Sequence, residues 1–281
     1  MNLAEPLAST WHAHLRLGFE RRAASTILVR REHVGPLRVQ KPFYPEGEAV
    51  CHAIVLHPPS GIVGGDALEI DVSVGQGAHA LLTTPGAGKW YRSAGAWASQ
   101  RLSFTVGAHG VLEWLPQETI VFDAARAAMR SSIDLAAEAR FIGMEVLCLG
   151  RRASGESFAS GALHLNTRIL RMGRPIWLER GQIEGGGGLL NAAAGLAGFS
   201  VSGTLLAAAQ HIEPGLLAAC RKIPALETGA QHGLTQLPEM LVARYLGHSS
   251  EAARHWFADL WQVLRPALIG REAQRPRIWN T

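Results

Sequence analysis

Five acidic side chains lie in predicted turns or strand interiors, where a carboxylate can do chemistry: Asp66, Glu118, Asp123, Glu145 and Glu179. Glu145 differs from the others because apolar residues of both parities surround it in Phe141-Ile-Gly-Met-Glu-Val-Leu-Cys-Leu149. Both faces of that strand should therefore be buried. A carboxylate there must be paired, bind a cation or meet internal water, because burying it alone is costly. Glu179 is similar, although Arg180 or another basic residue could neutralise it, and structural pairing stays the alternative for both acids.

Asp66 lies at the exit of a glycine-rich turn, His57-Pro-Pro-Ser-Gly-Ile-Val-Gly-Gly-Asp66, which leads into an alternating strand from Leu68 to Val74. The turn glycines, which allow backbone conformations that residues with a Cβ avoid, are Gly61, Gly64 and Gly65. A carboxylate in this position can accept bonds from backbone amides or reach a ligand. The simpler alternative is a turn followed by a strand.

Two local pairs offer metal donors. His12 and His14 are two residues apart in the strand Trp11 to Leu17, and a period of two puts both imidazoles on one side. An exposed polar face of an edge strand is the simpler explanation. Cys51 and His52 are adjacent, so a strand would point them to opposite faces. We assign no tight metal site and keep His12, His14 and Cys51 as weak candidates.

Known catalytic signatures are absent from the sequence. It has no Gly-x-Ser-x-Gly elbow, no His-Glu-x-x-His and no Cys ligand pair. The segment Pro85 to Lys89 resembles a phosphate loop, but Thr83 stands where such a loop needs its first glycine, and Trp90 where it needs Ser or Thr. The sequence therefore predicts no catalytic residue, no nucleotide site and no tightly bound cofactor.

Composition narrows the class of protein. With 281 residues, 47% apolar and 18% charged, the chain is typical of a folded protein with a sizeable core. The formal charge is +4, but the basic residues are scattered, which argues against nucleic acid as a partner. The three cysteines lack CxxC spacing, as expected for reduced thiols. The N-terminus has no signal-peptide pattern, and polar residues and glycines interrupt the longest apolar tract, Leu189 to Gln210. We expect a cytoplasmic protein without a membrane span.

Strands separated by glycine turns recur about every 8–12 residues, with no helix between them. The predicted strands are Trp11 to Leu17, Thr26 to Arg31, Cys51 to His57, Leu68 to Val74, His79 to Thr84, Thr119 to Phe122, Arg130 to Leu135, Phe141 to Leu149, Leu163 to Met172 and Ile176 to Ile183. Ala98 to Leu115 should form a hairpin turning at Gly107-Ala-His-Gly110, and Gly173-Arg-Pro175 should close another. This pattern predicts a mainly β (α+β) fold, a large antiparallel β scaffold.

A few helices are expected in the C-terminal third. Pro214 to Lys222 has the length of a short helix, and Ser250 to Leu264 has a serine cap and an apolar stripe, with Pro266 bending or ending it. Leu234 to Leu246 is either a strand or a mixed segment. No internal repeat or long linker is present, so we expect one domain, 1–281. It would have a β body over about 11–184 and a mixed α/β part over about 185–281.

Several long motifs together resemble one known family. They are His57-Pro-Pro-Ser-Gly-Ile-Val-Gly-Gly-Asp66, Thr83-Thr-Pro-Gly-Ala-Gly-Lys-Trp-Tyr-Arg-Ser93, Leu112-Glu-Trp-Leu-Pro-Gln-Glu-Thr-Ile-Val-Phe122, Leu147-Cys-Leu-Gly-Arg151 with Gly155-Glu-Ser-Phe158, and Pro276-Arg-Ile-Trp279. In this order, and over nearly the whole chain, they are similar to the urease accessory protein UreD (UreH) family. One departure is Gly88, where family members often carry a small hydroxyl residue.

The resemblance implies a non-enzymatic maturation factor with a β-rich scaffold. It implies binding to urease apoprotein and to UreF, and through UreF to the GTPase UreG, with a homodimer possible within the complex. The assembly would insert nickel into urease, and nickel would pass transiently through an internal channel. On this resemblance Asp66, Glu145 and Glu179 would line the nickel path, and Trp256, Trp261 and Trp279 are candidates for docking UreF, with core packing the alternative for the first two. Asp66→Ala or Glu145→Leu is then expected to leave the chain folded and to reduce nickel delivery.

Two other classes remain open at this point. A metal-dependent β-fold hydrolase using Asp66 and the histidines would need several ligands converging within about 2–2.6 Å of one metal. A lectin-like binding module would present an exposed aromatic platform and no internal channel. A conduit would instead place acids along a cavity.

Overall fold

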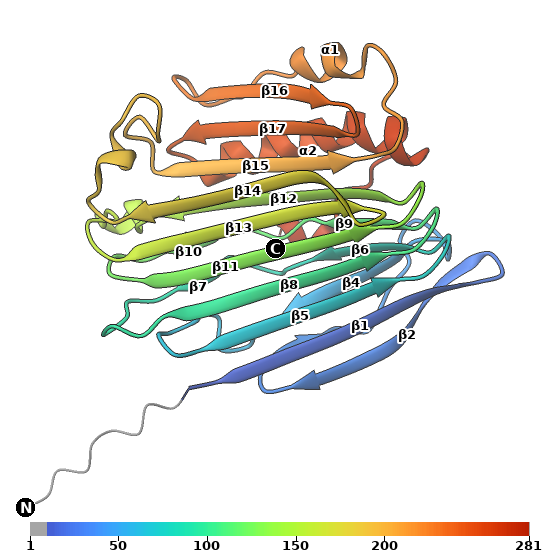
Figure 1. The fold of residues 1–281 in the computed structure, drawn as a ribbon, viewed down its shortest axis with the longest axis horizontal. Coiled ribbons are helices and arrows are strands. Elements are labelled where there is room, and N and C mark those ends of the chain that lie inside the picture. The colour runs from blue at the N-terminus through green and yellow to red at the C-terminus, as the bar shows by residue number, and fades with distance from the viewer. Residues whose placement is uncertain (1–9, 281) are drawn as a thin grey trace, which may run out of the picture.

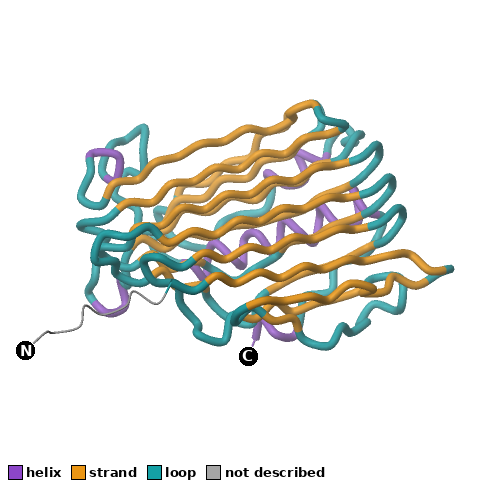
Figure 2. The backbone as a smooth tube through the Cα atoms, turned by 60° about the horizontal axis from the view of Figure 1, so that its bottom comes forward, coloured by secondary structure: helices purple, strands orange, loops and turns teal. Residues whose placement is uncertain are grey.

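The computed structural model of the protein describes residues 10–280, so the N-terminal segment in which no signal peptide is expected lies outside the described residues. Two β-sheets pack face to face, and helix α2 (Ser250–Ile269) lies against the outer face of the second sheet (Figure 1; Figure 2). None of the helices in the described part of the chain is long and apolar enough to span a membrane.

The order of strands in each sheet differs from their order in the chain. The first sheet runs β14 (Arg174–Glu184), β13 (Ala162–Arg171), β11 (Arg126–Leu135), β8 (Ala98–Val106), β5 (Ala67–Val74), β1 (His12–Arg22), β2 (Ser25–Val34). The second runs β16 (Gln231–Leu237), β17 (Met240–Gly247), β15 (Val201–Ala208), β12 (Arg140–Leu149), β9 (Val111–Trp114), β6 (His79–Thr83), β4 (Cys51–Leu56), β3 (Arg38–Val39). In addition, β10 (Thr119–Val121) pairs with β12, and β7 (Gly88–Trp90) pairs with β10. The remaining elements are α1 (Leu216–Arg221) and three 3₁₀ turns, Arg152–Ser154, Gly188–Leu190 and Arg277–Asn280.

The expectation of an antiparallel scaffold is wrong, because both sheets are mixed. From β4 to β13 the chain crosses repeatedly from one sheet to the other, so neighbours within a sheet run in the same direction. In the first sheet β1–β5, β5–β8, β8–β11 and β11–β13 are parallel pairs. In the second sheet β4–β6, β6–β9 and β9–β12 are parallel. The result is solenoid-like, with successive coils stacked side by side (Figure 1).

The hairpin expected over Ala98 to Leu115 is also wrong. Its two strands, β8 and β9, belong to different sheets. The turn at Gly107 to Gly110 stacks on the preceding turn. Gly107 donates its N–H to the Val74 carbonyl at 2.8 Å, and Gly77 donates its N–H to the Ala108 carbonyl at 2.9 Å. The backbone groups of this glycine turn therefore form hydrogen bonds with the neighbouring coil and not with the opposite strand of a hairpin. The hairpin expected at Gly173 is confirmed, because β13 and β14 pair antiparallel on either side of it.

Strand β12 lies between two apolar layers, which explains its continuous apolar sequence. Phe141, Leu147 and Leu149 pack in the cluster between the sheets, whereas Met144 and Val146 pack in the cluster under α2. Odd-numbered side chains of β12 therefore face the first sheet and even-numbered ones face the helix. This alternation points Glu145 into the space between the sheets.

Helix α2 is longer than its sequence pattern indicates. Ser249 caps its start by accepting the Ala252 N–H at 3.1 Å, as the sequence predicts. The helix does not end at Pro266 but continues to Ile269, where Gly270 in a left-handed conformation closes it. Pro266 removes only one backbone bond near the end of the helix, and buried Leu268 holds the last turn against the sheet. The segment of uncertain type, Leu234 to Leu246, forms the β16–β17 hairpin.

A buried ionic cluster anchors α2 to the second sheet. Arg265, which is fully buried, donates to Glu46 at 2.6 Å and to Glu113 of β9 at 3.1 Å. His52 lies 2.6 Å from Glu46, and His79 lies 2.7 Å from Glu113. Burial opposes the charge on Glu46, but the hydrogen bonds from His52 and Arg265 lower its pKa to about 2. The helix is thus held by charge pairs as well as by apolar packing.

Candidate functional site

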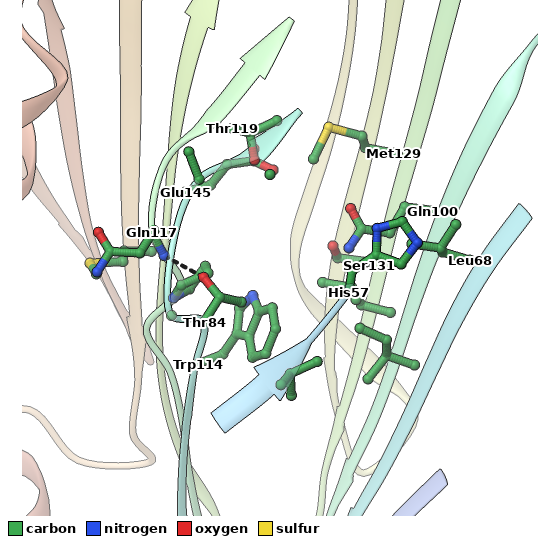
Figure 3. A pocket seen from close by; sticks show the side chains of 18 of the residues that line it. His57, Leu68, Thr84, Gln100, Trp114, Gln117, Thr119, Met129, Ser131 and Glu145 are labelled. Atoms are coloured by element: carbon green, nitrogen blue, oxygen red, sulfur yellow. Dashed lines mark hydrogen bonds between the residues drawn. The ribbon is translucent and has the colours of Figure 1, made fainter. Parts of the chain in front are cut away.

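A cavity of about 260 Å³ lies between the two sheets, which is room for several water molecules. Its polar lining comes from both sheets, from β7 and from the loops after β4, β6 and β9: His57, Ser60, Thr84, Lys89, Gln100, Gln117, Thr119, Ser131, Glu145, Thr167, Glu179 and Thr204. Figure 3 shows Glu145 and Gln117 on one wall and Gln100, Ser131 and Met129 on the facing wall. Ser60 and two further lining residues, Gly86 and Gly88, are exposed, so the cavity opens to solvent beside these loops.

Glu145 projects from the middle of β12 into this cavity. The residue lies deep in the protein, yet its side chain keeps some accessible surface because it faces the cavity. No group in the described part of the chain donates a hydrogen bond to its carboxylate. Burial and the nearby negative charge of Glu179 raise the pKa of Glu145 to about 7, although Arg244 opposes the rise. Glu145 is therefore a carboxyl group that can hold either a proton or a cation near neutral pH.

Glu179 lies on β14, at the edge of the first sheet, and also lines the cavity. It accepts a hydrogen bond from Arg244 of β17 at 2.6 Å, so the expected neutralising base exists but is not Arg180. Arg244 also donates to Thr204 Oγ1 at 2.7 Å. The structure therefore brings Glu145 and Glu179 to one cavity, and their assignment to an ion path stays what the family resemblance implies.

His57 is a cavity residue that was not selected among the candidate ligands from the sequence. It follows β4, and its Nε2 atom is buried without a hydrogen-bond partner among the described residues. Burial lowers the pKa of His57, although the charge of Asp66 opposes this. The imidazole is then neutral at pH 7, with a nitrogen lone pair free to bind an ion. The available signal was a polar residue directly after the apolar run Ala53 to Leu56.

Asp66 does not line the cavity, and its carboxylate is instead hydrogen-bonded to two backbone N–H groups. Its carboxylate accepts the backbone N–H of Trp11 at 3.1 Å and of Val63 at 3.0 Å, which ties β1 to the glycine turn. A Cβ on Gly61 would stand 1.9 Å from the Tyr91 ring, and Gly65 has a positive φ of 98°. The glycines therefore admit Tyr91 and the tight turn. Whether Asp66 also contacts a passing ion stays a prediction.

These contacts revise the expected result of the Asp66→Ala exchange. Removing the carboxylate leaves two part-buried backbone N–H groups without their acceptor, so we expect the free energy of unfolding to fall by about 1–2 kcal/mol. Urea denaturation followed by circular dichroism would measure it. Asp71→Ala, which removes a partly exposed carboxylate paired with His14, is the control and should cost less than about 1 kcal/mol. Equal stability of wild type and Asp66→Ala would show that these bonds are dispensable.

The segment that resembles a phosphate loop belongs to the cavity wall. Gly88 to Trp90 form strand β7, which pairs with β10, and no helix follows to present N–H groups to a phosphate. At Gly88 a Cβ would meet only Thr119 Oγ1, at 3.8 Å. A hydroxyl side chain would therefore fit at this position and face the cavity, so its absence here removes one polar contact.

The weak metal candidates do not line the cavity, and Cys51 lies apart from the two histidines. His14 lies on the outer face of the first sheet, 2.7 Å from Asp71, with His12 exposed on the same face. Cys51 is buried in the core, where burial raises the pKa of its thiol. Across residues 10–280, no group of three or more His, Cys, Asp or Glu side chains is arranged to hold a metal ion.

The three tryptophans considered for docking have different positions. Trp256 and Trp261 are both 1% exposed and pack between α2 and the second sheet, which confirms the core alternative for them. Trp279 is only partly buried and donates its Nε1–H to Thr83 Oγ1 at 2.9 Å. The C-terminal tail thus reaches back to the second sheet.

Comparison with known proteins gives one consistent family. A family model described as UreD urease accessory protein matches residues 12–280. The urease accessory protein UreD of Dechloromonas aromatica is 60% identical over 275 residues, covering 97% of this chain and 95% of that protein. The proteins of the same name from Azoarcus sp. and Nitrosococcus oceani are 57% and 50% identical, covering 96% and 98% of this chain and 94% and 92% of their own lengths.

Proposed function

The chain belongs to the family of UreD urease accessory proteins, and from this premise we propose that it is a maturation scaffold that helps to place nickel in the urease active site. It would do so without catalysing a reaction itself. Nickel is then its cargo, held transiently, and no cofactor is resident.

The observation that supports nickel transfer is the Glu145 carboxylate, which faces a partly polar cavity and has no protein partner among the described residues. Glu179 supplies a second carboxylate in the same cavity, and His57 supplies a neutral imidazole. Carboxylate oxygens and imidazole nitrogens are suitable ligands for Ni²⁺. Because they are distributed along the walls and do not converge, each would hold the ion weakly enough to release it.

The proposal keeps Glu145 and Glu179 as ligands of the path and adds His57. Asp66 stabilises the wall beside them through its bonds to Trp11 and Val63. That Asp66 also contacts the ion directly stays a separate proposal.

We propose urease apoprotein as the acceptor and UreF as the adjoining accessory protein, with the GTPase UreG reached through UreF. The GTP belongs to the partner, since the Gly86 to Lys89 segment of this chain lacks the residues and the helix of a nucleotide loop. The complex would assemble in the cytoplasm, with a second copy of the chain possible within it. The partly exposed tail around Trp279 is the segment we place at the UreF side.

The rival function, a metal-dependent hydrolase, has less support. It requires several ligands around one metal, whereas the candidate acids and histidines lie at separate places: Asp66 in a turn, His12 and His14 on the outer face, and Glu145 in the cavity. Nor do the residues that the structure describes include a cluster with metal-ligating geometry. The distributed arrangement favours passage of an ion over catalysis.

Co-expression tests the proposed function directly. Urease is produced with its other accessory proteins, with and without this chain, in medium supplemented with nickel. We expect urease activity and nickel content to be lost when only this chain is omitted, because no other component would supply the scaffold. Full activity and full nickel occupancy without it would overturn the proposal.

A further inference from the structure

The ion pair between Arg244 and Glu179 joins the two sheets at the side of the cavity away from the loop opening. Arg244 lies on β17 in the second sheet, and Glu179 lies on β14, the edge strand of the first. Their charged atoms are 2.6 Å apart. In the second sheet, β15, β12 and β9 lie between β17 and the strands β6 and β4, whose loops surround the opening. Figure 1 likewise shows β14, β15 and β17 on one side of the molecule and β4 and β6 on the other.

Strand register fixes the order of the residues at this side. Glu145 is directly opposite Thr204 in the β12–β15 pair, and Thr204 is directly opposite Arg244 in the β15–β17 pair. The three side chains therefore form one row across the inner face of the second sheet. From the first sheet Glu179 reaches the outer member of this row. The guanidinium contacts Thr204 at 2.7 Å, so it bridges the last cavity residues of both sheets.

Arg244 lies between the cavity and solvent. Both of its partners, Thr204 and Glu179, line the cavity, but Arg244 does not. Its side chain is 44% exposed, whereas Glu145, two strands away in the same row, lies in the interior. The guanidinium is therefore the outermost group of the row and closes the gap between the sheets at this point.

The charge of Arg244 gives this closure a chemical consequence. Glu179 is one of the two carboxylates available to a cation in the cavity, and the guanidinium already occupies it. A divalent cation near Glu145 and Glu179 would be attracted by two negative charges and repelled by Arg244. An ion pair as exposed as this one contributes little to stability, so the arginine can leave without disturbing the fold. The guanidinium also lies 5.6 Å from the centroid of the Trp177 ring, a cation–π contact that it would lose on leaving.

We propose that Arg244 is a displaceable counter-cation that closes a second end of the cavity, and that a divalent metal ion passes this end by replacing its guanidinium on Glu179. The inference rests on the proposed ion path and adds the group that controls one end of it. When Arg244 is on Glu179, this end of the cavity is closed, and the opening beside the loops remains. When Arg244 moves away, the cavity becomes a passage with two ends.

Calorimetric titration of the full, metal-free chain with Ni²⁺ alone tests the proposal. Arg244→Gln keeps a polar side chain, although a shorter one, and removes the charge, so we expect Ni²⁺ to bind at least about tenfold more tightly than to the wild type. Arg244→Gln with Glu179→Gln should lose this gain, because the vacated carboxylate is then absent. Arg180→Gln is the matched control: it removes an exposed arginine one residue from Glu179 and should leave the affinity unchanged.

Equal Ni²⁺ affinity of wild type and Arg244→Gln, including no measurable binding to either, would overturn the proposal. So would a gain that persists in the double variant or appears equally in Arg180→Gln. Thermal unfolding of each variant would confirm that the compared chains are folded. These outcomes are separate from the proposed function: if Arg244→Gln leaves the affinity unchanged but Glu145 is needed for nickel delivery, the ion path stands and the closing role of Arg244 is wrong.

Discussion

Exchanging Glu145 for glutamine is expected to reduce nickel delivery to urease apoprotein by about tenfold or more while the chain stays folded. Glutamine has nearly the shape of glutamate but cannot carry the negative charge that attracts an ion into the cavity. The measurement is urease activity and nickel content after co-expression with the variant. Glu145→Leu, which also removes the polar oxygen, should have at least as large an effect.

A stability measurement separates this loss from misfolding. Burial and the charge of Glu179 raise the pKa of Glu145 to about 7, from 4.5 for the free group. Between these values the folded chain keeps a proton that the unfolded chain releases, so the free energy of unfolding falls as pH rises through this window. Glu145→Gln cannot ionise, and at pH 8 it should be more stable than wild type by about 2–3 kcal/mol. Below pH 4.5 this advantage should disappear.

Glu69→Gln is the matched control for delivery, because Glu69 is a strand glutamate on the outer face of the first sheet, paired with Arg101. It should leave delivery unchanged. Normal nickel delivery by Glu145→Gln would refute the assignment of Glu145 to the path. Delivery lost together with stability at pH 8 would instead assign Glu145 a structural role.

Removing Arg265 should cause the largest loss of stability. Arg265→Met leaves the carboxylates of Glu46 and Glu113 buried without the cation between them, and an uncompensated buried charge costs about 3–5 kcal/mol. His79 already contacts Glu113 and is too short to take the place of the guanidinium at both acids. Urea denaturation at pH 7.5 would measure the change in the free energy of unfolding.

The comparison variant is Arg275→Met, which removes the surface pair between Arg275 and Asp259. Both side chains of that pair are 38% exposed, so the cost should be below about 1 kcal/mol. Adding Glu46→Gln and Glu113→Gln to Arg265→Met should restore part of the lost stability, since no unpaired charge then remains. A cost for Arg265→Met no larger than that for Arg275→Met would show that the cluster does not anchor α2.

Much of the local structure could be predicted because it depends on residues close in the sequence. The alternation from Leu68 to Val74 predicts β5, and Ser249 predicts the cap of α2. The continuous apolar run around Glu145 predicts a strand buried on both faces, and β12 is such a strand. These features rest on side-chain periodicity and on hydrogen bonds within a few residues.

The pairing of strands could not be predicted in the same way. A glycine turn such as Gly107 to Gly110 permits either a hairpin or a crossing to another sheet, because both need the same backbone freedom. The choice depends on the neighbouring coil, whose turn accepts and donates the backbone bonds that a hairpin would otherwise make. The sheets are therefore mixed where local spacing indicated antiparallel pairs.

The sequence by itself determined that the chain is rich in strands, that its motifs match one family, and that the buried carboxylate of Glu145 needs a partner, a cation or water. Only the tertiary structure decided what surrounds this carboxylate. Strand β12 points Glu145 towards a cavity, β14 brings Glu179 to the same cavity, and β17 places Arg244 at its edge. It also decided that Asp66 holds a turn. The reason is physical, since a residue's type sets what it can bind, whereas contacts between distant strands set what lies within its reach.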